Sequence, residues 1–77
     1  MTVYLLSIID HDDPTIGDFS QYHFIFANRD TAQKKINDWC NECNDQIKNV
    51  SYLSANWIIY HGTYFDYEVE EQIVRES

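Results

Sequence analysis

The sequence predicts an α+β fold in which one amphipathic helix packs on one face of a mostly antiparallel, four-stranded sheet, in the order β-β-α-β-β. Three observations predict it. One stretch repeats apolar residues at helical spacing, four shorter stretches have the patterns of strands, and 77 residues suffice for a single domain, 1–77. An amphipathic helix needs an apolar surface to cover, and a sheet supplies one.

The helix is predicted over Asp30–Asn49. Its apolar residues recur three or four positions apart and form one stripe: Ala32, Ile36, Trp39, Cys40, Cys43, Ile47 and Val50. Asp30 can cap the N-terminus, and Asn49 tolerates the left-handed conformation that ends many helices. The residues expected to form the core are Ala32, Ile36, Trp39, Cys43 and Ile47 on the helix and Val3, Leu5, Phe24, Phe26 and Phe65 on the sheet.

The first two strands are predicted over Thr2–Ile9 and Phe19–Ala27. Both faces of the first strand are apolar, which suits a central strand. Between them lies an acidic loop, Asp10–Asp18, which contains the only proline. The second strand has one aromatic face, formed by Tyr22, Phe24 and Phe26.

The last two strands, Trp57–Tyr60 and Tyr64–Val74, follow a connector over 51–55 and form a hairpin whose register has two alternatives. A three-residue loop at 61–63 puts Trp57 and Ile59 on the same face as Phe65 and Tyr67, whereas a two-residue loop puts Ile58 and Tyr60 there. We prefer the three-residue loop, because it gathers the larger side chains.

Thirteen acidic residues oppose five basic ones, for a formal charge of −8. Such a chain repels nucleic acid and anionic membranes and favours a basic partner, although acidity can also serve solubility alone. No apolar stretch is long enough to span a membrane, and the N-terminus carries no secretion signal. We therefore expect a cytoplasmic protein with no membrane contact and no direct contact with nucleic acid.

Two clusters of potential ligands are interpreted as structural. Cys40 and Cys43 share a helix face and could both touch one zinc ion, but no second paired motif supplies the other ligands, so we expect reduced thiols packed in the core. The acidic turn could bind a divalent cation, but its spacing fits no calcium loop. Its residues are Asp10, His11, Asp12 and Asp13. We expect no metal, no cofactor and, since no catalytic motif is present, no enzymatic activity.

The acidic residues form two regular rows. Asp66, Glu68 and Glu70 alternate along one face of the last strand, about 6.8 Å apart. Asp38, Glu42 and Asp45 follow helical spacing on the polar face of the helix. Tyr64, with Tyr60 and Tyr67, can add aromatic anchors of the kind that interfaces favour. These two rows and Tyr64 are the predicted partner-binding residues.

Several segments resemble small proteins of phages and mobile elements. They are Tyr4-Leu5-Leu6-Ser7-Ile8, then Asp10-His11-Asp12, Gly17-Asp18-Phe19, and a helix that starts near Ala32 and contains Trp39. In size, acidity and the plan of one helix on a sheet, the chain is similar to many anti-CRISPR proteins. The resemblance implies a phage-encoded inhibitor that blocks the nucleic-acid groove of a CRISPR effector complex or another defence nuclease in the host cytoplasm. It carries no functional residue over to this chain.

The leading hypothesis is therefore a non-enzymatic inhibitor that occupies a basic, nucleic-acid-binding surface with its acidic and tyrosine residues, since a row of carboxylates resembles a nucleic-acid backbone. The alternative is a small adaptor or homodimerising protein with no link to nucleic acid. A third hypothesis is a metal- or thiol-dependent activity through Cys40, Cys43 and the histidines.

Overall fold

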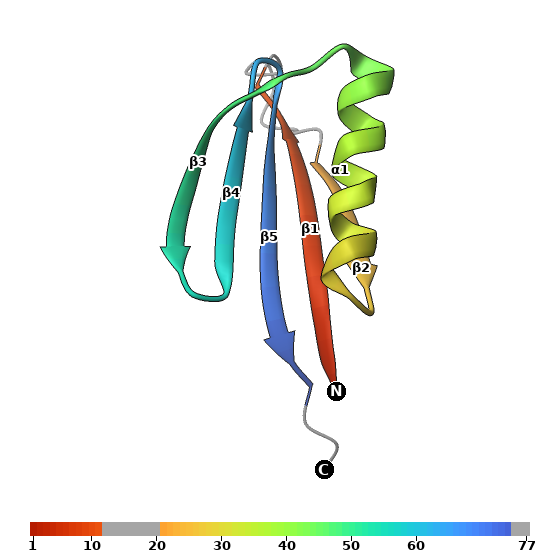
Figure 1. The fold of residues 1–77 in the computed structure, drawn as a ribbon, viewed down its shortest axis with the longest axis vertical. Coiled ribbons are helices and arrows are strands. Elements are labelled where there is room, and N and C mark those ends of the chain that lie inside the picture. The colour runs from red at the N-terminus through yellow and green to blue at the C-terminus, as the bar shows by residue number, and fades with distance from the viewer. Residues whose placement is uncertain (12–20, 75–77) are drawn as a thin grey trace.

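The computed structural model describes residues 1–11 and 21–74, which form one five-stranded sheet and one helix (Figure 1). In chain order these are β1 (Thr2–Asp10), β2 (Gln21–Phe26), α1 (Arg29–Cys43), β3 (Ile47–Ser54), β4 (Trp57–Gly62) and β5 (Phe65–Ile73). The strands lie in the order β2-β1-β5-β4-β3, and all neighbours are antiparallel. The prediction of an antiparallel sheet is confirmed, but the prediction of four strands is wrong.

The additional strand, β3, occupies residues that the sequence assigned to the end of the helix and to a connector. α1 ends at Cys43 because Asn44 takes the left-handed conformation, with φ 53°. Ile47 and Val50 continue the apolar spacing of three and four residues beyond Cys43, so the sequence pattern of a helix extends further than the helix itself. Both instead pair with residues of β4.

The helix also begins earlier than its predicted cap. The N-cap is Asn28, whose Oδ1 accepts a hydrogen bond from the backbone N–H of Thr31 at 2.9 Å. Asp30, the predicted cap, lies inside the first turn. Its negative charge there still favours the helix, because the exposed N–H groups make this end positive.

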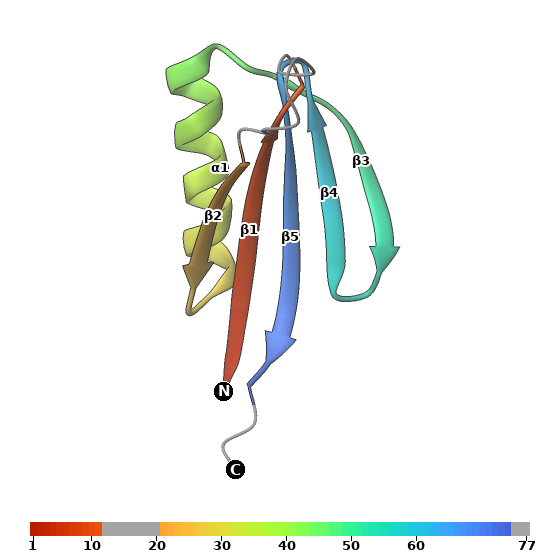
Figure 2. The same ribbon diagram turned by 180° about the vertical axis from the view of Figure 1, so that it is seen from behind.

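α1 packs against β1 and β2, so it covers one half of one face of the sheet (Figures 1 and 2). Leu6, Ile8, Ile36 and Tyr67 form the core, and each is at most 1% exposed. Around them pack Phe24, Phe26, Trp39, Cys40, Ile47, Tyr60, Phe65 and Val69. The core therefore joins α1 to β1, β2 and the middle of β5.

The predicted core is correct for Ala32, Ile36 and Trp39 but wrong for Val3 and Leu5. The even-numbered residues of β1 face α1, and the odd-numbered ones face away. Both faces of β1 are apolar, so its sequence did not decide between them. Cys43, also predicted in the core, is exposed.

The preferred register of the last hairpin is wrong as well. Tyr60 pairs with Tyr67 and Ile58 with Val69, so Ile58 and Tyr60 face α1 across a two-residue turn at 63–64. Gly62 stays within β4, where a Cβ atom would lie 2.3 Å from Asp45 Oδ2. In the observed register, Gly62 leaves the space that the Asp45 carboxylate occupies. The size of the apolar side chains, on which the prediction relied, did not identify this register.

Most of the predicted acidic loop, the first two residues of the predicted second strand and the tail over 75–77 lie outside the described residues. Within 1–11 and 21–74, no helix is long and apolar enough to cross a membrane.

The two faces of β1 give a matched test of the fold. We expect Leu6→Ala to lower the free energy of unfolding by about 2–5 kcal/mol, because Leu6 is fully buried. Leu5→Ala, on the opposite face of the same strand, should cost less. Urea denaturation measures both, and an equal or larger loss for Leu5 would show that the faces of β1 are misassigned.

Candidate functional site

The face of the sheet opposite α1 is covered by no element in the described part of the chain, and we call it the open face; Figure 2 views the sheet from this side. Directly paired residues of neighbouring strands share a face, so the register identifies its members. They are Val3, Leu5, Ser7 and Ile9 on β1, Gln21, His23 and Ile25 on β2, Asn49, Ser51 and Ser54 on β3, Trp57, Ile59 and His61 on β4, and Asp66, Glu68, Glu70 and Gln72 on β5.

The predicted acidic row lies along the middle of the open face. Asp66, Glu68 and Glu70 are partly exposed and belong to β5, the third of five strands. Glu68 Oε1 accepts a hydrogen bond from Trp57 Nε1 at 2.7 Å, and Glu70 Oε1 accepts one from Gln72 Nε2 at 3.1 Å. These bonds orient the two carboxylates and leave each with free acceptor capacity.

Apolar side chains border this row on both sides. Trp57 on β4 and Leu5 on β1 both pair with Glu70, and Trp57 is 38% exposed. An exposed tryptophan beside charged residues is typical of protein interfaces. Sequence reasoning missed Trp57 because the wrong hairpin register assigned it to the core.

The lysine and arginine residues of the described part of the chain lie away from the open face. None of the residues that the register places on the open face is lysine or arginine. Arg29, Lys34 and Lys35 all belong to α1, on the other side of the sheet, and Lys48 lies at a bulge of β3. Lys35 Nζ stands 4.8 Å from the centre of the Phe24 ring, and Arg29 contacts Glu71 at 3.4 Å. The open face is therefore negative, and the described lysine and arginine residues belong to α1 or to the bulge of β3.

A polar cluster lies at one end of the acidic row. Asp66 Oδ1 is 2.8 Å from His11 Nε2 and 3.0 Å from His61 Nδ1. The other ring nitrogen of His61, Nε2, is 2.8 Å from Ser51 Oγ. These residues come from β3, β4, β5 and the residue that follows β1, so only the assembled sheet brings them together.

The second predicted row is not continuous. Asp38 and Glu42 lie on the exposed side of α1, one helical turn apart, as predicted. Lys34 and Lys35 lie one turn before Asp38 and partly balance its charge. Asp45 lies beyond the end of the helix and is only 9% exposed, so it cannot belong to an exposed row.

The three tyrosines of the predicted anchor are also separated. Tyr64 lies in the β4–β5 turn and is 44% exposed, so it remains available to a partner. Tyr67 is fully buried, and Tyr60 lies on the same face as α1. The aromatic residue beside the acidic row of β5 is therefore Trp57, and not Tyr60 or Tyr67 as predicted.

The buried Asp45 carboxylate connects three segments. Its Oδ1 accepts hydrogen bonds from the backbone N–H groups of Gln46 and Tyr64, each at 2.9 Å, and its Oδ2 accepts one from the hydroxyl of Tyr67 at 2.6 Å. Burial acts to raise the pKa of Asp45, but these bonds favour the charged form and hold the pKa below its usual value. Burial, followed by the bond to Asp45, raises the pKa of Tyr67.

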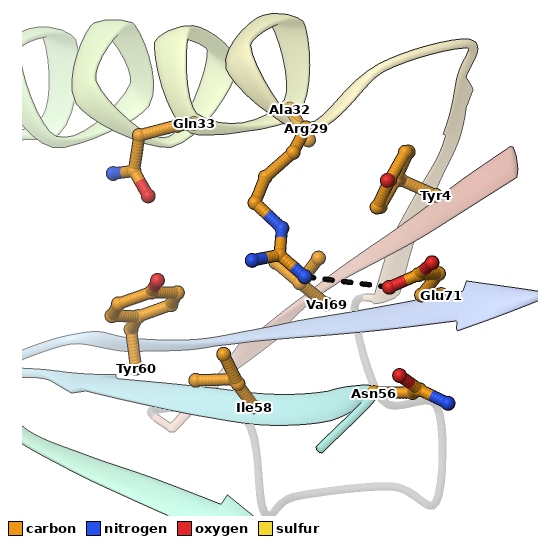
Figure 3. Close-up of a pocket in the computed structure, with 9 residues that line it drawn as sticks. All are labelled: Tyr4, Arg29, Ala32, Gln33, Asn56, Ile58, Tyr60, Val69 and Glu71. Atoms are coloured by element: carbon orange, nitrogen blue, oxygen red, sulfur yellow. Dashed lines mark hydrogen bonds and ion pairs between the residues drawn. The ribbon is translucent and has the colours of Figure 1, made fainter.

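A groove on the other side of the sheet lies between α1 and strands β4 and β5 (Figure 3). Its lining residues are Tyr4, Arg29, Ala32, Gln33, Asn56, Ile58, Tyr60, Val69 and Glu71, and the contact between Arg29 and Glu71 crosses it. The cavity volume of about 40 Å³ has room for water but not for an organic substrate, which needs roughly 300 Å³ or more.

The two thiols differ in burial. Cys40 is half-buried, and burial raises its pKa, whereas Cys43 is exposed; both are free. No three His, Cys, Asp or Glu side chains of the described residues are placed to coordinate one metal ion. The other candidate ligands of the acidic turn, Asp12 and Asp13, lie outside those residues.

Comparison with known proteins gives no relative from which a function could be transferred: the chain matches no protein-family model, no curated protein and no solved structure.

Removal of the Asp45 carboxylate should destabilise the fold. We expect Asp45→Ala to cost about 2–4 kcal/mol, because buried donors of Tyr64 and Tyr67 lose their acceptor. Asp38→Ala, on the exposed side of α1, should change the free energy of unfolding by no more than about 0.5 kcal/mol.

Because the pKa of Asp45 is lowered, its contribution to the free energy of unfolding is present above about pH 3.9 and is lost as the pH falls through its folded pKa. Urea denaturation at pH 7 and pH 3 measures this, and an equal cost at both pH values would contradict it.

The pKa of His11 should lie above its ordinary value of 6.5, mainly because His11 is hydrogen-bonded to Asp66 and also because it is close to that charge. A raised pKa means that this contact stabilises the fold fully below pH 6.5 and that the contribution is lost as the pH rises through the folded pKa. NMR titration of the His11 ring measures the pKa. It should fall in Asp66→Asn, and an unchanged pKa would exclude the contact in solution.

Proposed function

We propose that this protein binds a basic protein surface through its open face and thereby inhibits a complex that handles nucleic acid. The observation that carries the proposal is the row of Asp66, Glu68 and Glu70 in the middle of a face to which the register assigns no lysine or arginine. A surface that binds phosphates with lysine and arginine can also bind a row of carboxylates. Inhibition by occupancy requires no catalytic step.

The proposed partner is a CRISPR effector complex or another defence nuclease, as the resemblance of the sequence implies, and the proposed place of action is the cytoplasm of the host. Complementary charge makes such an encounter fast, and a central aromatic residue supplies affinity. Trp57 is suited to this second role, because it is exposed beside the row and its indole is oriented by Glu68.

Of the two predicted rows, the structure favours the one on β5. Its three carboxylates lie on one face to which the register assigns no lysine or arginine, whereas Asp38 is flanked by Lys34 and Lys35. The homodimerising alternative is disfavoured on this face, because two copies packed face to face would bring six carboxylates together.

Two double variants with the same change in charge test the proposal. Glu68→Lys/Glu70→Lys and Asp38→Lys/Glu42→Lys each add four charges, from −8 to −4. We expect only the first to lose capture of a nucleic-acid-binding complex from bacterial lysate and to lose competition with DNA for the captured complex. Asp66 is left unchanged, because its contacts with the two histidines belong to the fold.

Salt provides the control on mechanism. Capture by the unaltered protein should weaken as ionic strength rises, because exposed charges are screened over about 8 Å at physiological salt. If the two double variants bind equally well, or if the protein recovers only itself, the acidic row is not the binding site.

A further inference from the structure

The polar cluster at the end of the open face suggests chemistry beyond partner binding. Ser51, His61 and Asp66 belong to the adjacent strands β3, β4 and β5 and form one unbroken chain of hydrogen bonds. In this chain His61 uses Nε2 toward the serine and Nδ1 toward the carboxylate. A nucleophile bonded to a base, and the base bonded to a third group, is the arrangement that activates serine in many hydrolases.

The hydrogen-bond roles follow from the chemistry of the groups. An ionised carboxylate can only accept, so His61 Nδ1 must carry a proton and donate it to Asp66 Oδ1 at 3.0 Å. A neutral imidazole has only one N–H, which leaves Nε2 as an acceptor. Ser51 must then donate its hydroxyl proton to Nε2 at 2.8 Å. This is the protonation state in which the imidazole can act as a general base.

A fourth residue, Asn49, can stabilise the negative charge that develops on the carbonyl oxygen of an ester. Asn49 pairs directly with His61 across the β3–β4 ladder and precedes Ser51 by two residues on the same face. Its Oδ1 accepts the backbone N–H of Val50 at 2.9 Å, and its amide nitrogen has no hydrogen-bond partner within residues 1–11 and 21–74. Side-chain amides of asparagine can stabilise the oxyanion that forms during acyl transfer.

We propose that Ser51 is a nucleophile for carboxylic esters, with His61 as its general base, Asp66 as the positioning residue and Asn49 as the oxyanion donor. Ser51 Oγ attacks the ester carbonyl carbon while its proton passes to His61 Nε2. The tetrahedral intermediate then collapses, the alcohol leaves with that proton, and an acyl-serine remains. Water, deprotonated by His61, releases the carboxylic acid and restores the serine. No oxidant, metal or further reactant is needed.

The same sheet contains a matched internal control. Ser7 Oγ lies 3.1 Å from His23 Nδ1 on the open face, so it also has a histidine partner. Within the described residues, His23 has no hydrogen bond to a carboxylate. Ser7 therefore has a base without the positioning residue, and the two serines can be compared within one folded molecule.

The test uses an alkyl fluorophosphonate, which phosphonylates activated serines with loss of fluoride, and mass spectrometry to locate the adduct. In serine hydrolases, loss of the carboxylate that orients the histidine lowers the rate by about 10⁴-fold, so Ser51 should react at least about 100 times faster than Ser7. The unaltered protein should also release p-nitrophenol from p-nitrophenyl acetate, and Ser51→Ala should lose this activity. Equal labelling of the two serines, or labelling of neither, would overturn the proposal without reference to any partner.

Two further variants separate chemistry from structure. Asp66→Asn keeps a hydrogen-bonding group but no longer requires the proton on Nδ1, so labelling of Ser51 should fall at least about tenfold and its pH profile should change. Asn49→Ala should slow release of p-nitrophenol while the circular dichroism spectrum stays unchanged. His11 also contributes to this pH profile, because it contacts the same Asp66 oxygen as His61. Labelling that is independent of pH and of Asp66 would show that His61 does not act as the base.

Discussion

The buried carboxylate of Asp45 is the interaction on which the arrangement of this fold depends. It lies just after the left-handed residue that ends α1, and it binds donors from the residue before β3, from the β4–β5 turn and from β5 itself. A buried charge is tolerated only when its acceptor capacity is filled, and here three donors fill it. The same carboxylate accounts for Gly62, since any side chain there would meet Asp45 Oδ2.

This junction decides which residues of the last three strands face α1. Because Gly62 remains in β4 beside Asp45, the hairpin turns over two residues and places Ile58 and Tyr60 on the side of the helix. Trp57, Ile59 and His61 are then directed to the open face. A shift of one residue would reverse both sets, because side chains alternate along a strand. The contact between Asp45 and Gly62 is thus linked to the choice of side chains on the open face.

The helix lies on one side of the sheet only, and the acidic residues of β5 on the uncovered face differ in their surroundings. Glu68 and Glu70 present charge beside the exposed Trp57, which is suited to binding a protein. Asp66, the next acid in the row, is instead held by two histidines, one of which is bonded to Ser51. The proposed binding surface and the proposed reactive serine therefore meet at one residue, and they can be tested separately because Glu68 and Glu70 take no part in the polar cluster.

The sequence by itself determined the features that depend on local periodicity: the positions of β1 and β2, the inward side of the helix at Ala32, Ile36 and Trp39, and the alternation that keeps the acidic row of β5 on one face. Only the tertiary structure decided the end of the helix, the strand β3, the register of β4, the burial of Asp45 and the contacts of Ser51 with His61. The physical reason is that the apolar stripe of a helix and the alternation of a strand are both set by residues only a few positions apart in the sequence. Which face a strand buries, and which side chains meet across a sheet, depends on pairing with residues far away in the chain.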